Sequence, residues 1–191
     1  MRDINVEKVN LIIFARRPEI SIGKSRLKNK IGKALGSNFY YHNLLRTIMK
    51  ISADKRINIK LCVTPDSSIQ NWSKSIFPRI KRIPQGPGDI GEKMWRVFSK
   101  SPNKTIIIGS DIPDITSKLI LNAWKKLYTS NIVLGPAEDG GFWLIGISQS
   151  KKIKGLFNNI IWSKHNTLEQ LKKNINPSEK ISFVKTLKDI D

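Results

Sequence analysis

Several features of secreted and membrane proteins are missing from this sequence. Cys62 is the only cysteine among 191 residues, which excludes an intramolecular disulfide and a cysteine metal cluster. Its apolar neighbours indicate a small buried side chain in a core strand and not a nucleophile. The first apolar run, residues 11–15, is far too short for a signal peptide or a membrane span. We therefore expect a soluble, cytoplasmic protein with no membrane span.

Acidic residues are scarce. Asp and Glu number 15 against 34 Lys and Arg, which gives a formal net charge of +19. Such an excess makes a polyanionic partner the first to consider. The basic residues are nevertheless scattered in pairs such as Lys125-Lys126 and Lys151-Lys152, without a tail or a long block. This pattern favours solvated faces over a nucleic-acid interface, while a general attraction for phosphates is compatible with it.

Short apolar runs alternate with segments of helical periodicity. Strands are predicted over residues 9–15, 57–63, 79–83, 105–108, 132–134 and 142–147. Helices are predicted over residues 24–35, 38–51, 67–77, 118–128 and 166–173, and a further helix follows the glycine-rich segment at residues 84–94 and ends near Ser99. Gly36 should end the first helix. Thr116 or Ser117 should cap the helix over residues 118–128, and its Trp124 should face the core. The order predicts an α/β fold, a three-layer α/β/α sandwich with a mostly parallel twisted sheet, in a single domain over residues 1–191. Because no helix separates the strands within residues 132–147, we expect one antiparallel strand.

A carboxylate follows the fourth predicted strand. The β-branched run at residues 105–108 ends in Gly-Ser-Asp111, and open α/β sheets bind ligands at the carboxyl ends of their strands. Asp111, with Asp114 three residues later, could hold a divalent metal against a diphosphate, because hard cations take carboxylate and phosphate oxygens. The local alternative is that both residues turn the chain and cap the next helix.

An acidic loop joins the next two strands. Residues 135–141 are too long and too acidic for a minimal hairpin turn. Glu138 and Asp139 supply acceptors for a sugar hydroxyl, a metal or a proton, and the adjacent Gly140 and Gly141 allow the backbone to approach a ligand closely. The aromatic pair that follows, Phe142-Trp143, either stacks on a sugar or base or packs in the core.

A basic loop follows the first strand. Arg16, Arg17, Lys24 and Arg26 lie there with a proline and a glycine, directly before a predicted helix. Backbone amides, a helix N-terminus and basic side chains together favour an anion, so we predict a phosphate cradle, with a solvated basic loop as the alternative. The glycine spacing is not that of a Walker loop.

Two long motifs carry a resemblance to a known family. Gly109-Ser-Asp-Ile-Pro-Asp114 and Gly135-Pro-Ala-Glu-Asp-Gly-Gly-Phe-Trp-Leu-Ile-Gly146 resemble a bacterial family identified as GT-A-like glycosyltransferases of the arsenosugar-biosynthesis (selenodomain-associated transferase 1) type, itself similar to nucleotide-diphospho-sugar transferases. The basic loop matches at Phe14, Ala15, Pro18, Lys24, Arg26 and Leu27, while Ser21 and Gly23 depart from the pattern. Gly88-Asp-Ile-Gly-Glu92 is a third match. There a nucleotide or sugar pocket is implied, whereas the local alternative is a glycine-rich turn with Asp89 as a helix cap.

The resemblance implies a Rossmann-like GT-A fold and transfer of a glycosyl group from a nucleotide sugar donor to a small acceptor. Mg²⁺ or Mn²⁺ would bind Asp111 and Asp114, and Asp139 or Glu138 would act on the acceptor hydroxyl. The other implied residues are Ala15, Arg16, Lys24, Arg26, Gln85, Gly88, Asp89, Gly91 and Ser110 for the nucleotide or phosphates, and Gly140, Gly141, Phe142, Trp143 and Ser163 for acceptor or sugar, with Ser163 alternatively a helix cap.

Two alternatives remain. One is a nucleotidyltransferase that couples a nucleoside triphosphate to a small phosphorylated substrate and releases pyrophosphate. The other is a noncatalytic nucleic-acid-binding domain driven by the +19 charge. The sequence leaves open the identity of nucleotide, sugar and acceptor, the oligomeric state (a homodimer included), and a metal role for Asp189 and Asp191.

Overall fold

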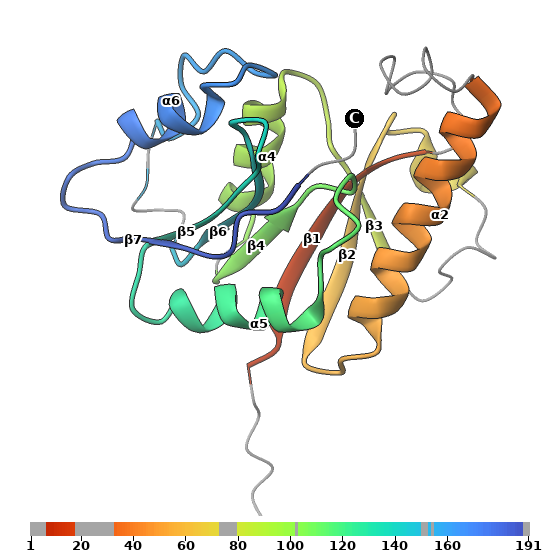
Figure 1. Ribbon diagram of the computed structural model, residues 1–191, viewed down its shortest axis with the longest axis horizontal. Helices are drawn as coiled ribbons and strands as arrows, with labels where there is room; N and C mark the ends of the chain where they lie inside the picture. Colours follow the sequence, from red (N-terminus) through yellow and green to blue (C-terminus); the bar gives the residue numbers. More distant parts are fainter. Residues whose placement is uncertain are drawn as a thin grey trace, which may run out of the picture.

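A seven-stranded sheet forms the centre of the protein, in the order β3-β2-β1-β4-β6-β5-β7 (Figure 1). The computed structural model describes residues 7–17, 33–72, 80–101, 103–149, 153 and 155–188. The strands are β1 (Val9–Arg16), β2 (Ile57–Thr64), β3 (Lys81–Pro84), β4 (Thr105–Ile108), β5 (Ile132–Pro136), β6 (Phe142–Ile147) and β7 (Ile181–Phe183). β6 is antiparallel to β4 and β5, whereas the other pairs are parallel. The predicted mostly parallel sheet with one antiparallel strand is therefore confirmed.

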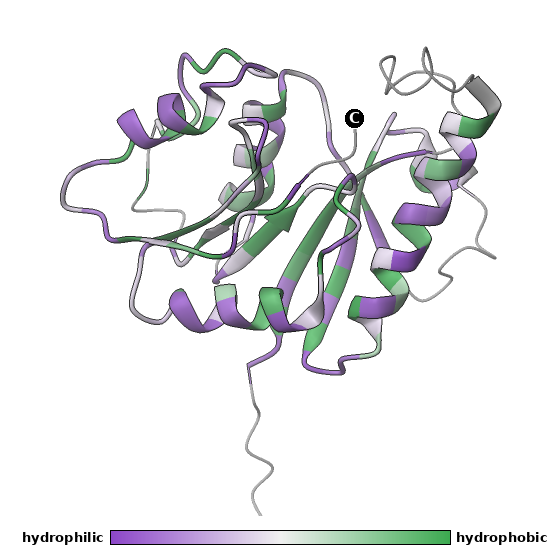
Figure 2. Ribbon diagram, viewed as in Figure 1, coloured by the Kyte–Doolittle hydropathy of each residue, from purple (hydrophilic) through white to green (hydrophobic). Residues whose placement is uncertain are grey.

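The central strands are apolar on both faces. In β1, Leu11 and Ile13 belong to one hydrophobic cluster, and Ile12 and Phe14 belong to the other. Successive side chains of a strand point to opposite faces, so a continuous apolar run supplies both clusters. Figure 2 shows these apolar strands between helices whose outward surfaces are hydrophilic.

Helices cover both faces of the sheet. The helix α2 (Lys33–Ser52) and the helix α5 (Ser117–Lys126) pack on one face through Ile48 and Trp124. The helices α4 (Ile90–Ser99) and α6 (Thr167–Lys173) contribute Phe98 and Leu171 to the cluster on the opposite face. In Figure 1, α2 and α5 lie in front of the sheet and α4 lies behind it. This arrangement confirms the α/β/α sandwich.

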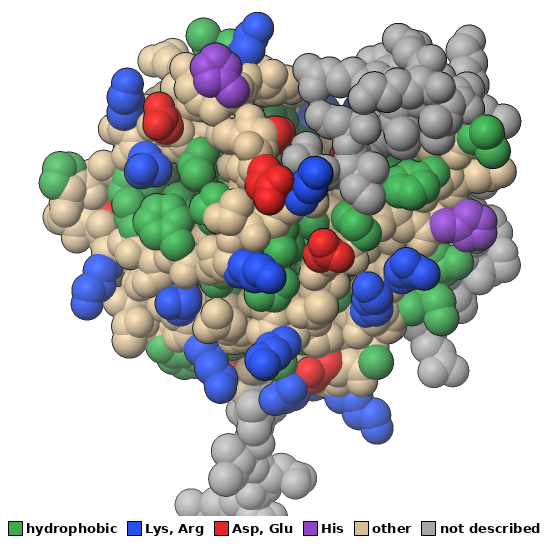
Figure 3. All heavy atoms as spheres, viewed as in Figure 1, with side chains coloured by type: hydrophobic (Ala, Val, Ile, Leu, Met, Phe, Trp, Pro, Cys, Tyr) green, Lys and Arg blue, Asp and Glu red, His purple; other side chains and the backbone are tan. Residues whose placement is uncertain are grey.

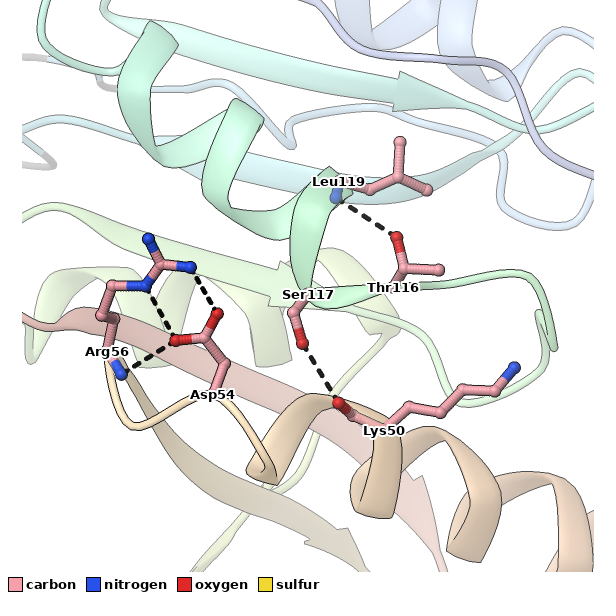
Figure 4. A network of polar contacts seen from close by, with 6 residues as sticks. All are labelled: Lys50, Asp54, Arg56, Thr116, Ser117 and Leu119. Carbon is pink, nitrogen blue, oxygen red and sulfur yellow. Dashed lines mark hydrogen bonds and ion pairs between the residues drawn. The ribbon is translucent and has the colours of Figure 1, made fainter.

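Local hydrogen bonds set the start of α5. The Oγ1 atom of Thr116 accepts from the N–H of Leu119 at 3.4 Å, so Thr116 is the cap, as one of the two predictions had it. The hydroxyl of Ser117 donates to the carbonyl of Lys50 in α2 at 3.1 Å, which ties the two front helices together (Figure 4). An ion pair between Asp54 and Arg56 lies beside this contact and lowers the pKa of the Asp54 carboxyl to about 2.

One helix boundary differs from the prediction. α2 runs without a break from Lys33 to Ser52, so the predicted stop at Gly36 is wrong. Gly36 is buried within the helix, and burial of an apolar helix face outweighs the ~1 kcal/mol that glycine costs in a helix interior. The short helix α3 (Ser68–Asn71) is followed by Trp72, and the rest of the helix predicted up to residue 77 lies outside the described residues. No helix among the described residues is long and apolar enough to cross a membrane.

The reversal of β6 gathers the acidic segments at one edge of the sheet. The carboxyl ends of β1 and β4 lie at this edge because the two strands are parallel. β6 begins at the same edge, with Leu144 opposite Ile108 and Phe142 opposite Pro136. The carboxyl ends of β1 and β4 and the connection from β5 to β6 therefore meet there, which is the ligand-binding edge of open α/β sheets.

Candidate functional site

A cavity of about 280 Å³ opens at this edge. Small-molecule sites typically span ~300–1,000 Å³, so the volume suits a compact ligand group. Its lining is mostly apolar, with few polar residues. The apolar lining consists of Phe14, Ile90, Met94, Ile107, Ile108, Ile112, Ala137, Phe142, Trp143, Ile145 and Trp162, and the remaining lining residues are Gly109, Asp111, Asp139, Gly141, Ser163, Lys164 and Thr167.

Asp111 is half-buried at the end of β4, where side chains from α2 organise the chain. The hydroxyls of Tyr40 and Ser110 lie 3.1 Å apart, and the Ser110 hydroxyl donates to Oδ1 of Asp111 at 3.4 Å. The amide of Asn43 donates to the Ser110 carbonyl at 3.0 Å. The predicted nucleotide residue Ser110 is thus buried within a hydrogen-bonded network that fixes the segment before Asp111.

Tyr40 is kept neutral in this network. Burial raises the pKa of its phenol to about 12, and the negative charge of Asp111 acts in the same direction. The backbone N–H of Arg16, the last residue of β1, donates to the Tyr40 oxygen at 2.8 Å. Tyr40 therefore joins the first residues of the basic loop to the segment that carries Asp111.

Asp139 reaches the cavity from the connection between β5 and β6. Its Oδ1 atom accepts from the N–H of Gly141 at 2.8 Å, which orients the carboxylate. The C-terminal segment holds this connection in place, because Glu138 N–H donates to the Leu187 carbonyl and Leu187 N–H donates to Pro136, both at 3.1 Å. Asp111 and Asp139, which are far apart in the sequence, line the same cavity.

The other two predicted carboxylates lie elsewhere. Glu138 and Asp114 are both exposed, and neither lines the cavity. Glu138 is adjacent to Asp139 in an irregular segment, but only Asp139 faces the cavity. The structure therefore brings together one carboxylate from each predicted acidic pair.

Gly140 is required by the chain itself. Its φ is +85°, and a Cβ there would lie 1.7 Å from the carbonyl oxygen of His165. The Gly140 carbonyl accepts from Leu168 N–H at 2.9 Å. We predicted that this glycine lets the backbone approach a ligand, whereas the close approach that the structure contains is to residue 165. This packing brings Lys164 and Thr167 to the cavity.

The two aromatic residues after the glycines differ in environment. Trp143 is 2% exposed, and its Nε1 atom donates to the Lys185 carbonyl at 3.0 Å, so it packs in the core while it also lines the cavity. Phe142 is half-buried, and its ring packs edge to face on the ring of Trp162, with the two ring centroids 6.4 Å apart. Of the two, Phe142 has the environment suited to contact a ligand.

The Gly88-Asp-Ile-Gly-Glu92 segment and the preceding Gln85 are explained by contacts within the chain. Asp89 and Glu92 form a capping box at the start of α4. The amide of Gln85 is buried and donates to the carbonyls of Ala15 and Cys62 at the ends of β1 and β2. Gly88 has a φ of +97°. The local alternative for Asp89 is therefore confirmed, and a ligand contact by this segment stays a prediction.

Gly91, on the buried face of α4, is also explained by packing within the chain. A Cβ on Gly91 would lie 2.5 Å from the Trp162 ring, so this glycine allows α4 to pack against the residues that close the cavity.

Ser163 has a φ of 62° and lines the cavity. Asn166 is the residue at the start of α6, so the predicted cap by Ser163 is wrong.

Some predicted residues lie outside the described residues. They are Lys24 and Arg26 of the phosphate cradle, with Ser21 and Gly23, and the C-terminal Asp189 and Asp191. The structure adds residues that the sequence did not single out as a site. They are Tyr40 and Asn43 behind Asp111, and Trp162, Lys164 and Thr167 at the cavity. The only signal for them in the sequence is the position of Trp162 and Lys164 beside Ser163.

The donor set of the cavity suits a hard divalent cation shared with a ligand. Among residues 7–17, 33–72, 80–101, 103–149, 153 and 155–188, no group of three His, Cys, Asp or Glu side chains could hold a metal. Mg²⁺ is commonly bound by one or two carboxylates together with substrate phosphates and water, and not by an all-protein cage. Asp111, which lines the cavity, can supply one such carboxylate.

The sheet order, the covering helices and the cavity at the carboxyl edge define an α/β protein with the Rossmann-like, GT-A-like fold of nucleotide-diphospho-sugar transferases. Within this class, residues 47–164 match the family described as "Uncharacterized protein conserved in bacteria (DUF2064)", and the chain belongs to this family. No curated protein matches the sequence.

Solved structures support the fold. A protein from Desulfovibrio desulfuricans G20, provisionally named a nucleotide-diphospho-sugar transferase, is 24% identical with a TM-score of 0.82, over 96% of this chain and 82% of that one. A 4-diphosphocytidyl-2C-methyl-D-erythritol synthase from Anaerococcus prevotii DSM 20548 is 14% identical with a TM-score of 0.61, over 95% and 88%. A glucosyl-3-phosphoglycerate synthase from Mycobacterium tuberculosis, in complex with Mn²⁺, UDP and glucosyl-3-phosphoglycerate, is 12% identical with a TM-score of 0.57, over 96% and 71%.

Proposed function

We propose that the protein is a glycosyltransferase that moves a sugar from a nucleotide-diphosphate sugar to a small acceptor. The observation that carries this proposal is that Asp111 and Asp139 line one cavity at the carboxyl edge of a sheet of this fold. The similarity to a protein named as a nucleotide-diphospho-sugar transferase supports it. So does the M. tuberculosis synthase of the same fold, which binds Mn²⁺ and UDP.

In this proposal Asp111 would hold Mg²⁺ or Mn²⁺ beside the donor diphosphate. The bound cation supplies electrostatic stabilisation of the negative charge that develops on the leaving nucleoside diphosphate. Arg16, with Lys24 and Arg26 beyond the described residues, neutralises the donor phosphates. Phe142 and Trp162 provide aromatic surface for the sugar or acceptor at the cavity.

Asp139 acts on the acceptor. With Oδ1 engaged by Gly141 N–H, Oδ2 accepts the hydrogen of the acceptor hydroxyl. The acceptor oxygen forms the new bond to the anomeric carbon, and the bond from that carbon to the phosphate oxygen breaks. The acceptor proton passes to Asp139, and the electron pair of the broken bond leaves with the nucleoside diphosphate.

A nucleotidyltransferase is the second candidate. The A. prevotii synthase has the same fold, and its named product carries a diphosphocytidyl group. The two reactions differ in the leaving group, which is a nucleoside diphosphate in glycosyl transfer and pyrophosphate in nucleotidyl transfer. Nucleic-acid binding receives no comparable support, since Figure 3 shows Lys and Arg spread over the visible face and not gathered in one block.

The test measures which leaving group appears. Purified protein with Mn²⁺ is incubated with UDP, GDP and CDP sugars, or with the nucleoside triphosphates, and a panel of small alcohols and sugar phosphates. We expect nucleoside diphosphate from one nucleotide sugar, with losses of at least about 100-fold in Asp111→Asn and Asp139→Asn. The control is Glu169→Gln, which removes one negative charge from the exposed surface of α6. Pyrophosphate from a triphosphate would instead select nucleotidyl transfer, and full activity in Asp111→Asn would refute the metal assignment.

A further inference from the structure

The geometry points to Tyr40 as a positioning residue that sets the orientation of Asp111 and couples it to the end of β1, an inference that rests on the proposed function. Tyr40 lies on α2 and does not line the cavity. Its hydroxyl nevertheless lies where the ends of β1 and β4 meet. It accepts from Arg16 N–H at 2.8 Å and lies 3.1 Å from the Ser110 hydroxyl.

The direction of the hydrogen bonds follows from which atoms must donate. The Arg16 N–H donates to the phenol oxygen, and the phenol hydrogen remains available to the Ser110 oxygen. The Ser110 hydrogen is then directed to Oδ1 of Asp111 at 3.4 Å. The reverse direction would use the Ser110 hydrogen for Tyr40 and remove this donor from Asp111. The donor chain therefore runs from the Arg16 backbone through two hydroxyls to the carboxylate.

This arrangement orients the carboxylate of Asp111 at the wall of the cavity. The Ser110 hydroxyl contacts Oδ1 along one direction, and Asp111 lines the cavity. A tyrosine hydroxyl is protonated at neutral pH, so Tyr40 is available as a donor. The Asn43 amide fixes the backbone of Ser110 separately, which means that loss of the Tyr40 hydroxyl leaves the course of the chain in place.

The chain also joins two parts of the proposed site. Arg17 N–H donates to the Thr64 carbonyl at 3.1 Å, directly beyond the Arg16 contact with Tyr40. The backbone at the end of β1 is therefore held by Tyr40, the same side chain that supports Asp111.

The experiment measures Mn²⁺ affinity, which does not require an identified substrate. Free Mn²⁺ is followed by its EPR signal during titration of the wild type, Tyr40→Phe, Ser110→Ala, the double variant and Asp111→Asn. The matched control is Tyr41→Phe, since Tyr41 is the adjacent half-buried tyrosine and its ring packs edge to face on the exposed His42. Thermal unfolding of each variant establishes that binding is measured on folded protein.

We expect Tyr40→Phe and Ser110→Ala each to weaken Mn²⁺ binding about tenfold, with the double variant no weaker than about 20-fold because both act through one chain. Tyr41→Phe should bind as the wild type does. Wild-type Mn²⁺ affinity in Tyr40→Phe would overturn the inference, and so would a loss in the double variant equal to the product of the two single losses. In either case, weaker Mn²⁺ binding in Asp111→Asn would leave the proposed function intact. Unchanged binding in Asp111→Asn would overturn both.

Discussion

Gly109 offers a substitution that should separate folding from ligand binding. It lies between β4 and Asp111 and lines the cavity. A Cβ built on it meets no atom within 4 Å, and its φ lies outside the left-handed region. At Gly135, by contrast, a Cβ would lie 2.6 Å from the Trp143 ring. The fold therefore does not require glycine at position 109, and the space beside it is open to a ligand.

Gly109→Ala should raise the free energy of unfolding and weaken ligand binding. Gly109→Ala reduces the freedom of the unfolded chain without creating a clash, which should stabilise the protein by ~0.4–1 kcal/mol and raise Tm by about 1–4 °C. A ligand packed against the Gly109 backbone would meet the new methyl group at an overpacking cost of ~1–3 kcal/mol. This corresponds to about 5- to 150-fold weaker binding.

The assay is thermal unfolding with and without Mn²⁺ and the nucleotide sugar that the wild type turns over. We expect Gly109→Ala to have a higher Tm than the wild type and a smaller ligand-dependent shift, with Gly109→Val losing the shift altogether. Gly135→Ala is the contrasting variant, since it should lower Tm by several degrees. An undiminished ligand shift in Gly109→Val would refute the placement of the ligand beside Gly109.

Three further outcomes follow from buried or constrained groups. Cys62 is buried and its thiol pKa is raised to about 12, so a disulfide reagent at pH 8 should modify it only at the rate of unfolding; fast modification of native protein would contradict this. Burial raises the pKa of Tyr40 from 10.0 to about 12, so the folded protein holds the phenol proton more tightly than the unfolded chain does. The contribution of this group to folding stability is therefore complete below pH 10 and is lost as the pH rises towards 12. Urea unfolding at pH 9 and pH 11 should show a smaller loss in Tyr40→Phe than in the wild type, and equal losses would speak against it. Gly140→Ala should destabilise the protein by ~1–3 kcal/mol even without ligand, because its Cβ would lie 1.7 Å from His165; wild-type stability in denaturant would show that this packing is wrong.

The sequence predicts the sheet well because its signals are local. Runs such as residues 105–108 are continuous and β-branched, and the structure buries all four residues. The family resemblance implied roles for Asp111 and Asp139 in one reaction, and both line one cavity in the structure. Gly36 was mispredicted because the tertiary contacts that bury it within α2 have no local signature in the sequence.

Partners distant in sequence could not be predicted. Gly140 looked like a ligand contact, and the atom that requires it is the carbonyl of His165. Tyr40 gave no signal, since its neighbours Arg16 and Ser110 are brought to it only by the parallel pairing of β1 and β4. Glycines and tyrosines satisfy packing and ligand contacts alike, so their roles depend on the tertiary structure.

The most direct test of the proposed site is anomalous diffraction at the manganese edge. Crystals would be grown with Mn²⁺ and the nucleoside diphosphate of the donor that the protein turns over. We predict one anomalous peak coordinated by the carboxylate of Asp111 and by the diphosphate, with Asp139 facing the same cavity. A peak bound to the diphosphate and to carboxylates elsewhere, with Asp111 uncoordinated, would contradict the proposed site.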